Sequence, residues 1–227
     1  MPAFAPGTRV LFQGDSITDG NRGRNADPNH ILGHGYQFVI AARFGEQLAE
    51  RHLVFLNRGI SGNKVSDLAR RWQADTIALK PDLLSILIGI NDLNAGVGAA
   101  DYERQYDQLL TDTRAALPSV RLVLGEPFGL PVGHFATDWE KHRADLTVRR
   151  EIVHRLAAKH HAVVVPYQRA FDEATRRAAA TEWIWDGIHP TYAGHQLMAN
   201  EWIRAVRTAW PAGSAVTALP APAAPGK

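Results

Sequence analysis

Four short stretches of the sequence combine glycine with side chains that could carry out acyl transfer. They are "GDSIT" (14–18), "SGN" (61–63), "GIND" (89–92) and "DGIH" (186–189). A serine nucleophile needs a base, and the base needs a partner that orients it. Ser16 could be the nucleophile and His189 the base. Asp186 could orient that base, because a tight turn can hold a carboxylate against an imidazole three residues away.

The tetrahedral intermediate of acyl transfer also requires hydrogen-bond donors aimed at its oxyanion. The candidates are the backbone N–H groups of Ser16 and Gly62 and the side-chain amide of Asn91. A glycine lets the backbone approach a substrate closely, and a neutral amide donates without forming an ion pair. The candidates for lining the substrate pocket are Asp15, Asn63 and Trp185.

Each of these residues, taken alone, also fits a structural role. Ser16 could cap a helix, Gly62 could serve a turn, and Asn91 could end a strand. His189, before Pro190, could simply stand at a helix entrance, with Pro190 expected at the first helical position. Trp185 could stack on a sugar or pack in the core. Four complementary roles in four separate turns favour the catalytic interpretation.

The elements between these turns predict an α/β fold. Segments with helical spacing, such as 101–117 and the stretch after Pro190, alternate with short apolar runs. The runs are nearly continuous in branched and aromatic residues, as in strands covered on both faces. They are Arg9–Gln13, Leu53–Asn57, Leu83–Gly89, Arg121–Gly125 and Ala162–Tyr167. We therefore expect a three-layer α/β/α sandwich with a five-stranded parallel sheet.

This architecture places the four turns together. Ligands of open parallel sheets bind beyond the carboxyl ends of the strands. The first three turns come after the first three apolar runs, and the fourth follows the fifth run and one more helix. We expect all four to meet at one edge of the sheet.

The four blocks resemble those of the SGNH hydrolases, also called the GDSL esterase and lipase family. Ser16, Gly62, Asn91 and His189 match the four residues that give the family its name, and Ile17 replaces the usual leucine. The resemblance extends from Val10 to about Trp210. It implies a flavodoxin-like fold and ester hydrolysis through an acyl-enzyme, with no metal or organic cofactor.

The flanking stretches "NRGISGNKVSDLARRW" and "DGIHPTYAGHQLMA" look most like bacterial carbohydrate acetylesterases of the acetylxylan esterase type. That resemblance implies removal of acetyl groups from xylan, xylo-oligosaccharides or related acetylated carbohydrates. The alternatives are an arylesterase, thioesterase or lysophospholipase of the same family. A carbohydrate-binding protein without catalytic activity is a further alternative on the same fold.

The composition excludes several other classes. The net charge is +2, from 25 basic and 23 acidic residues, and no basic run suggests nucleic-acid binding. No stretch reaches the roughly twenty apolar residues of a membrane span. The absence of cysteine rules out disulfides, thiolate zinc sites and cysteine catalysis. We expect a small-molecule or oligosaccharide ester as partner, with a homo-oligomer left open. No signal peptide is visible, so a cytoplasmic location is expected unless a leader was removed.

One domain is expected over residues 1–210, followed by a disordered tail rich in proline and alanine over 211–227. The long polar loop 21–35 could rim the site or form a subunit contact. The ten histidines raise the question of a metal site, but glycines flank His34, so we do not expect it to form a helical ligand pair with His30. No metal site is predicted, and His195 is expected to be a packing residue.

Overall fold

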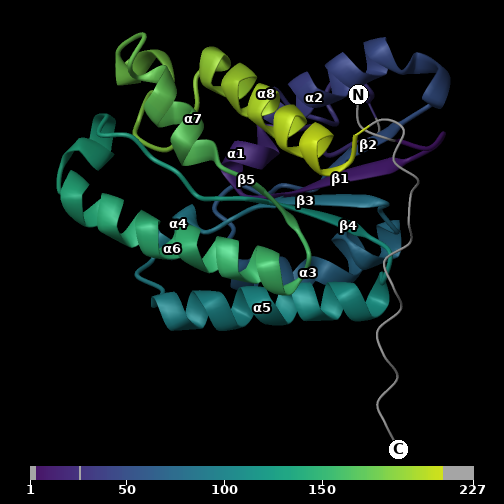
Figure 1. Ribbon diagram of the computed structural model, residues 1–227, viewed down its shortest axis with the longest axis horizontal. Helices are drawn as coiled ribbons and strands as arrows, with labels where there is room; N and C mark the ends of the chain where they lie inside the picture. Colours follow the sequence, from purple (N-terminus) through teal and green to yellow (C-terminus); the bar gives the residue numbers. More distant parts are fainter. Residues whose placement is uncertain (1–3, 26, 212–227) are drawn as a thin grey trace, which may run out of the picture.

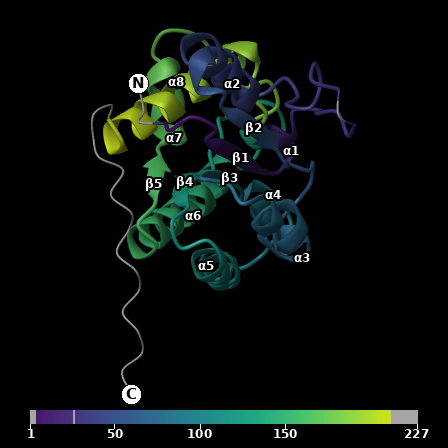
Figure 2. The same cartoon turned by 90° about the vertical axis from the view of Figure 1, so that its right-hand side faces the viewer.

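A five-stranded parallel sheet forms the centre of the computed structural model, which describes residues 4–25 and 27–211. The strands lie in the order β2-β1-β3-β4-β5, seen nearly end-on in Figure 2. Their bounds are β1 Arg9–Gly14, β2 Val54–Asn57, β3 Leu83–Leu87, β4 Arg121–Gly125 and β5 Val163–Val165. In the register of the central strands, Leu11 lies between Leu56 and Leu84.

Helices cover both faces of the sheet, so the predicted α/β/α sandwich is confirmed. In Figure 1, α2, α7 and α8 lie over one face, and α3, α5 and α6 lie over the other. The helices are α1 Ser16–Asp19, α2 Tyr36–Gln47, α3 Val65–Asp75, α4 Ile90–Asn94, α5 Ala99–Ala116, α6 Trp139–Lys159, α7 Tyr167–Ala174 and α8 Tyr192–Ala209. Single 3₁₀ turns are η1 Ala49–Arg51, η2 Ile77–Leu79, η3 Gly133–Ala136 and η4 Ala180–Glu182.

The strands are apolar throughout because successive side chains enter two different cores. Phe12 points into the core under α2 and α8, where its ring lies 5.7 Å from that of Trp202. The preceding Leu11 points into the opposite core, together with Leu68 of α3 and Leu109 of α5. Full burial of each such side chain stabilises the fold by roughly 1.5–3 kcal/mol.

The order of the strands creates a crevice beside β1. The chain passes from β1 to β2 on one side and then returns to β3 on the other side. The connections that leave β1 and β3 therefore diverge, and the carboxyl ends of these two strands border a topological switch point. Ser16 follows β1 and Asn91 follows β3, so both candidates lie at this crevice.

Three strands are shorter than the sequence predicts: β2 begins one residue late, at Val54, and β3 and β5 lose two residues or more. The run Leu83–Gly89 leaves the sheet after Leu87, because Gly89, with φ +128°, turns the chain into α4. The run Ala162–Tyr167 contributes only Val163–Val165. Pro166 has no N–H for the ladder, and the next residue already begins α7.

The predicted place of Pro190 at the first position of a helix is wrong. Helix α8 begins two residues later, and Thr191 is its N-cap, with Oγ1 accepting from the Gly194 N–H at 3.2 Å. Pro190 instead pairs with Ile184 in an isolated antiparallel bridge. The bridge closes the turn 184–190, so the residues around His189 form a closed loop ahead of the helix.

The predicted disordered tail, apart from Pro211, lies outside the described residues. Within residues 4–25 and 27–211, no helix combines the length and the apolar character that crossing a bilayer requires.

Candidate active site

Ser16, His189 and Asp186 form a continuous hydrogen-bonded row at the carboxyl edge of the sheet. Ser16 Oγ lies 2.8 Å from His189 Nε2, and His189 Nδ1 lies 2.6 Å from Asp186 Oδ2. A carboxylate can only accept, so the imidazole proton belongs on Nδ1 and Nε2 accepts from the serine hydroxyl. In this arrangement the imidazole can remove the serine proton.

The short helix α1 presents Ser16. Asp15 is its N-cap, and Asp15 Oδ1 accepts from the Ile17 N–H at 3.1 Å. The N–H of Ser16, at the first helical position, has no hydrogen-bond acceptor within the described part of the chain. Ser16 therefore offers both a hydroxyl and a free backbone N–H at the start of the helix. Because Asp15 is the helix cap, a structural role for this stretch is compatible with Ser16 as the nucleophile.

The turn that carries Asp186 and His189 is held by its own carboxylate. Asp186 Oδ1 accepts from the N–H groups of Ile188 at 3.0 Å and of His189 at 2.7 Å. Burial acts to raise the pKa of Asp186, but the His189 ring and these two N–H groups outweigh it, so the pKa lies below its ordinary value. Asp186 therefore stays ionised and keeps the imidazole in one orientation.

The turn also rests on the loop after β4. The Leu130 N–H donates to the Gly187 carbonyl at 3.0 Å. Gly133, at φ +56°, lies so close that a Cβ there would stand 2.6 Å from the Asp186 carbonyl oxygen. The sequence "EPFGLP" (126–131) offers no catalytic group, and the structure assigns its loop a supporting position.

Gly62 and Asn91 lie in two loops that hydrogen bonds connect to each other and to the helix of the serine. Gly62 has φ +81°, which favours glycine, and its N–H has no acceptor among the described residues. Asn91 Nδ2 donates one hydrogen bond to the Asn63 carbonyl at 3.1 Å, and this bond orients the amide. The amide retains a second N–H that could meet an oxyanion.

Asp92 supports the same loop from below. Its two carboxyl oxygens each lie 3.3 Å from the Val65 N–H at the start of α3. Burial raises the pKa of Asp92 above its ordinary value. Burial also raises the pKa of Asp15 to about 7, with the nearby Asp92 adding to the rise and the Ile17 N–H opposing it. Two carboxyl groups with a reduced tendency to ionise thus lie beneath the site.

Sequence reasoning missed two polar side chains that join the loops. Asp19 Oδ2 accepts from the Ser61 N–H at 3.0 Å and from Arg24 at 2.7 Å. Asn57 donates from Nδ2 to the carbonyls of Thr18 and Leu32, at 2.7 and 2.9 Å. Both are buried: Asp19 directly follows the block 14–18, and Asn57 is the last residue of the apolar run that forms β2. Their places beside a catalytic block and at the end of an apolar run could have marked them as candidates. The sequence does not show which groups they bind.

The three candidates for lining the substrate pocket have different environments. Trp185 is 63% exposed, and its ring is stacked on the His189 ring at 5.9 Å. Asn63 is half-buried, and its Oδ1 accepts from Arg71 at 2.9 Å, so it borders the site beside Asn91. Asp15 is only 1% exposed and lies under α1, so the structure places it below the accessible surface and not on it.

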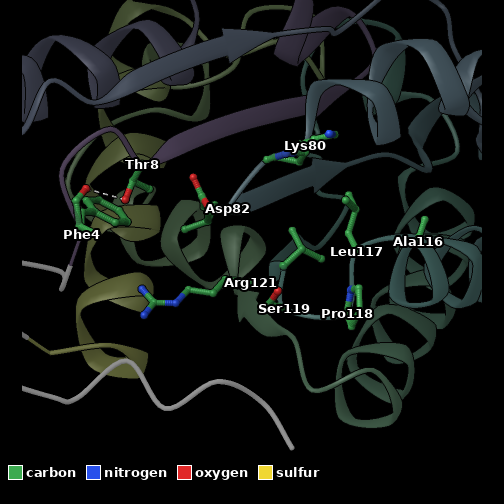
Figure 3. A pocket seen from close by; sticks show the side chains of 13 residues that line it. Phe4, Thr8, Lys80, Asp82, Ala116, Leu117, Pro118, Ser119 and Arg121 are labelled. Carbon is green, nitrogen blue, oxygen red and sulfur yellow. Dashed lines mark hydrogen bonds between the residues drawn. The ribbon is translucent and has the colours of Figure 1, made fainter. Parts of the chain in front are cut away.

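Two cavities lie at opposite edges of the sheet. One of about 330 Å³ is next to His189 and is lined by His34, Trp185, Pro190, Thr191, Tyr192 and His195. A larger one of about 480 Å³ is lined by Thr8, Asp82 and Arg121, which precede or begin strands (Figure 3). The larger cavity is therefore at the amino edge, away from Ser16.

The histidines do not gather into a metal site. Over residues 4–25 and 27–211, no group of three or more His, Asp and Glu side chains could hold a metal ion. His195 is buried, as expected, but it is more than a packing residue, because its Nδ1 accepts from the Tyr36 N–H at 3.1 Å.

Comparisons with known proteins identify the family of this chain. Residues 12–197 match the GDSL-like lipase/acylhydrolase family. The chain is 31% identical over 216 residues to an acetylxylan esterase of Geobacillus stearothermophilus. The matched region covers 90% of this chain and 96% of that protein.

Solved structures show the same fold. A GDSL-like lipase candidate from Parabacteroides merdae is 38% identical with a TM-score of 0.84, covering 90% of this chain and 97% of the other. A catalytic mutant of the Geobacillus stearothermophilus acetylxylan esterase is 30% identical with a TM-score of 0.82, covering 89% and 95%. The chain therefore belongs to the GDSL-like lipase/acylhydrolase family and is a carboxylic ester hydrolase.

Proposed function

We propose that this esterase removes acetyl groups from xylan, xylo-oligosaccharides or related acetylated carbohydrates, with Ser16, His189 and Asp186 as a catalytic triad. The observation that carries the chemistry is the row of hydrogen bonds from Ser16 Oγ through His189 to Asp186, at 2.8 and 2.6 Å.

In the first step His189 Nε2 takes the proton of the Ser16 hydroxyl while Oγ attacks the acetyl carbonyl carbon. The carbonyl oxygen becomes an oxyanion that accepts from the N–H groups of Ser16 and Gly62 and from the Asn91 amide. The ester C–O bond then breaks, and His189 Nε2 returns the proton to the departing sugar oxygen. The products of this step are the free hydroxyl of the sugar and an acetyl ester on Ser16.

In the second step a water molecule gives its proton to His189 Nε2 and attacks the acetyl-enzyme. The same donors stabilise the second tetrahedral intermediate, and its collapse returns the proton to Ser16 Oγ and releases acetate. Asp186 remains ionised throughout and stabilises the imidazolium that forms twice in each cycle.

Two observations support a saccharide ester as the substrate. One is the 31% identity with a protein that is an acetylxylan esterase. The other is the exposed Trp185 ring beside His189, since aromatic faces suit the C–H faces of sugars.

The test is acetate release from acetylated xylo-oligosaccharides by the wild type and by Ser16→Ala. We expect turnover by the wild type, and a loss of roughly 10⁴-fold or more in the variant, since no other group replaces the nucleophile. A serine-directed fluorophosphonate should label the wild type once and leave Ser16→Ala unlabelled. Equal turnover by the two proteins would overturn the assignment of Ser16.

A chain-length series of aryl esters separates the alternatives within the family. A preference for acetate over longer acyl chains agrees with the proposal. A preference for long acyl chains, or for thioesters, would instead point to a lysophospholipase or a thioesterase. Sugar binding without any labelling by the fluorophosphonate would indicate a non-catalytic carbohydrate-binding protein.

A further inference from the structure

The cavity beside His189 has features of a built binding site. It measures about 330 Å³, at the lower end of the range for small-molecule sites, which fits one sugar ring. Its walls come from two distant parts of the chain: His34 lies in loop 21–35, and the other lining residues lie between 185 and 195. Loop 21–35, whose role was open from the sequence, thus contributes to a wall of this cavity.

Aromatic surface is exposed at the cavity. Tyr192 is 87% exposed and Trp185 is 63% exposed, although both are large side chains. The Trp185 ring is inclined by only 20° to the His189 ring, so one of its faces is against the imidazole. Its backbone is also fixed, because the Trp185 N–H donates to the His189 carbonyl at 3.1 Å.

His195 adds a polar group with a defined direction. It is only 7% exposed, and its Nδ1 accepts from the Tyr36 N–H at the start of α2. Burial lowers the pKa of His195 to about 4, so the ring is neutral at neutral pH. With Nδ1 used as an acceptor, the ring proton belongs on Nε2.

This Nε2–H donor is available to a ligand. It has no hydrogen-bond partner among the described residues, and it is not one of the fully enclosed polar atoms. A neutral imidazole fixed as a donor, in the wall of a cavity, can recognise a hydroxyl or ether oxygen without attracting a counter-ion.

The cavity lies next to the place where the alcohol part of the ester must leave, because Trp185 in its wall is stacked on the His189 ring. The leaving oxygen must come within hydrogen-bond distance of His189 Nε2, which returns its proton. The carbonyl oxygen, in contrast, must point to Gly62 and Asn91. A group attached to the leaving oxygen can therefore reach Trp185, whose ring centroid is 5.9 Å from that of the imidazole.

We propose that this cavity binds a sugar ring of the alcohol part of the substrate, with Trp185 and Tyr192 contacting its C–H faces and His195 Nε2–H donating to a sugar oxygen. The inference rests on the proposed deacetylation of carbohydrates and extends it by assigning residues that distinguish saccharide esters from simple aryl esters.

His195→Asn tests the donor. The asparagine Oδ1 can replace Nδ1 as the acceptor for the Tyr36 N–H, but the variant has no group at the position of Nε2. We measure kcat/KM for acetylated xylobiose and for 4-nitrophenyl acetate, and we expect the ratio of the two to fall about fivefold. A role in folding alone would lower both values together and leave the ratio unchanged. Unacetylated xylotriose should also become a weaker competitive inhibitor of aryl ester hydrolysis.

Tyr192→Ala is a second variant that does not depend on buried packing, because the side chain is largely exposed. We expect it to lower the same ratio about threefold. His161→Asn is the matched control, since His161 is exposed, has φ +50°, where asparagine is tolerated, and lies beyond α6, just before β5. It should leave the ratio unchanged.

The outcomes separate the two proposals. Acetate release by the wild type with an unchanged ratio in both variants overturns the sugar site and leaves the proposed function standing. Hydrolysis of aryl acetate without any acetate release from saccharides overturns both. Light scattering shows whether a variant changes the oligomeric state. If the ratio of the two kcat/KM values falls only in a variant that also dissociates from an oligomer, a second copy covers the cavity and the sugar site is overturned.

Discussion

The Asp19 carboxylate accepts a hydrogen bond from the Ser61 N–H at 3.0 Å, and it joins the helix of the nucleophile to the loop of Gly62. Asp19 lies one helical turn after Ser16, and Ser61 precedes Gly62. The relative position of the nucleophile and one oxyanion donor thus depends on one buried carboxylate, which Arg24 also contacts.

Asp19→Asn is expected to lower kcat about tenfold with a smaller change in KM, because a small misplacement of the donor weakens the transition state more than substrate binding. Steady-state kinetics with an aryl acetate measures both constants. Arg24→Ala is the comparison, since the Arg24 side chain is 54% exposed and such pairs contribute about 1 kcal/mol or less. Equal effects of the two substitutions would contradict a positioning role for Asp19.

Asn91→Ala is expected to lower kcat by roughly 10²–10³-fold, as removal of one preorganised oxyanion donor does. The substitution also removes the hydrogen bond to the Asn63 carbonyl. The control is Asn94→Ala, three residues away from the oxyanion candidate, where the asparagine is exposed at the end of the same short helix. A decrease below tenfold at Asn91 would remove the amide from the proposed oxyanion site.

Gly133→Ala should displace the catalytic turn. A Cβ at Gly133 would stand 2.6 Å from the carbonyl oxygen of Asp186 and 2.7 Å from its Cα, so the backbone of one residue must move. We expect a decrease of about 10²-fold in kcat/KM, since a shift of about 1 Å can have that effect. Gly45→Ala is the matched control in α2, where an added Cβ meets no atom within 4 Å. It should retain activity and unfold at an equal or higher temperature.

Asp15 should make the stability of the protein depend on pH. Its pKa is about 7 in the folded protein against an ordinary value of 3.8. Between these values the folded state holds a proton that the unfolded chain has released. The contribution of Asp15 to the free energy of unfolding therefore falls as the pH rises from about 4 to about 7.

Asp15→Asn removes this titration and keeps an oxygen for the Ile17 N–H. The free energy of unfolding of the variant, minus that of the wild type, should therefore increase across the same pH range. Urea unfolding at pH 5, 6 and 7.5 measures it, with Asp112→Asn at an exposed position of α5 as the control. A difference that does not vary with pH would contradict the raised pKa.

The fold was predictable because its strands are buried on both faces. A short, continuous apolar run such as Leu83–Leu87 is typical of a strand that is buried on both faces. Helical segments between such runs indicate that the strands pair in parallel. The ends of the strands were less predictable. Gly89 and Pro166 each end a strand earlier than the apolar run suggests, because backbone geometry and a missing N–H, not hydrophobicity, decide where the ladder stops.

The sequence by itself determined the kinds of residue in the site and the edge of the sheet where they meet. Ser16, Gly62 and Asn91 follow the carboxyl ends of β1, β2 and β3, and His189 follows β5 and one more helix, so the order of elements along the chain brings them to the same edge. Only the tertiary structure decided which groups touch. The contacts of Asp19 with Ser61 and of His195 with Tyr36 join residues 42 and 159 positions apart, and no local pattern records such pairs. Hydrogen bonds depend on distances of a few tenths of an ångström, which are set only when the helices and loops pack together.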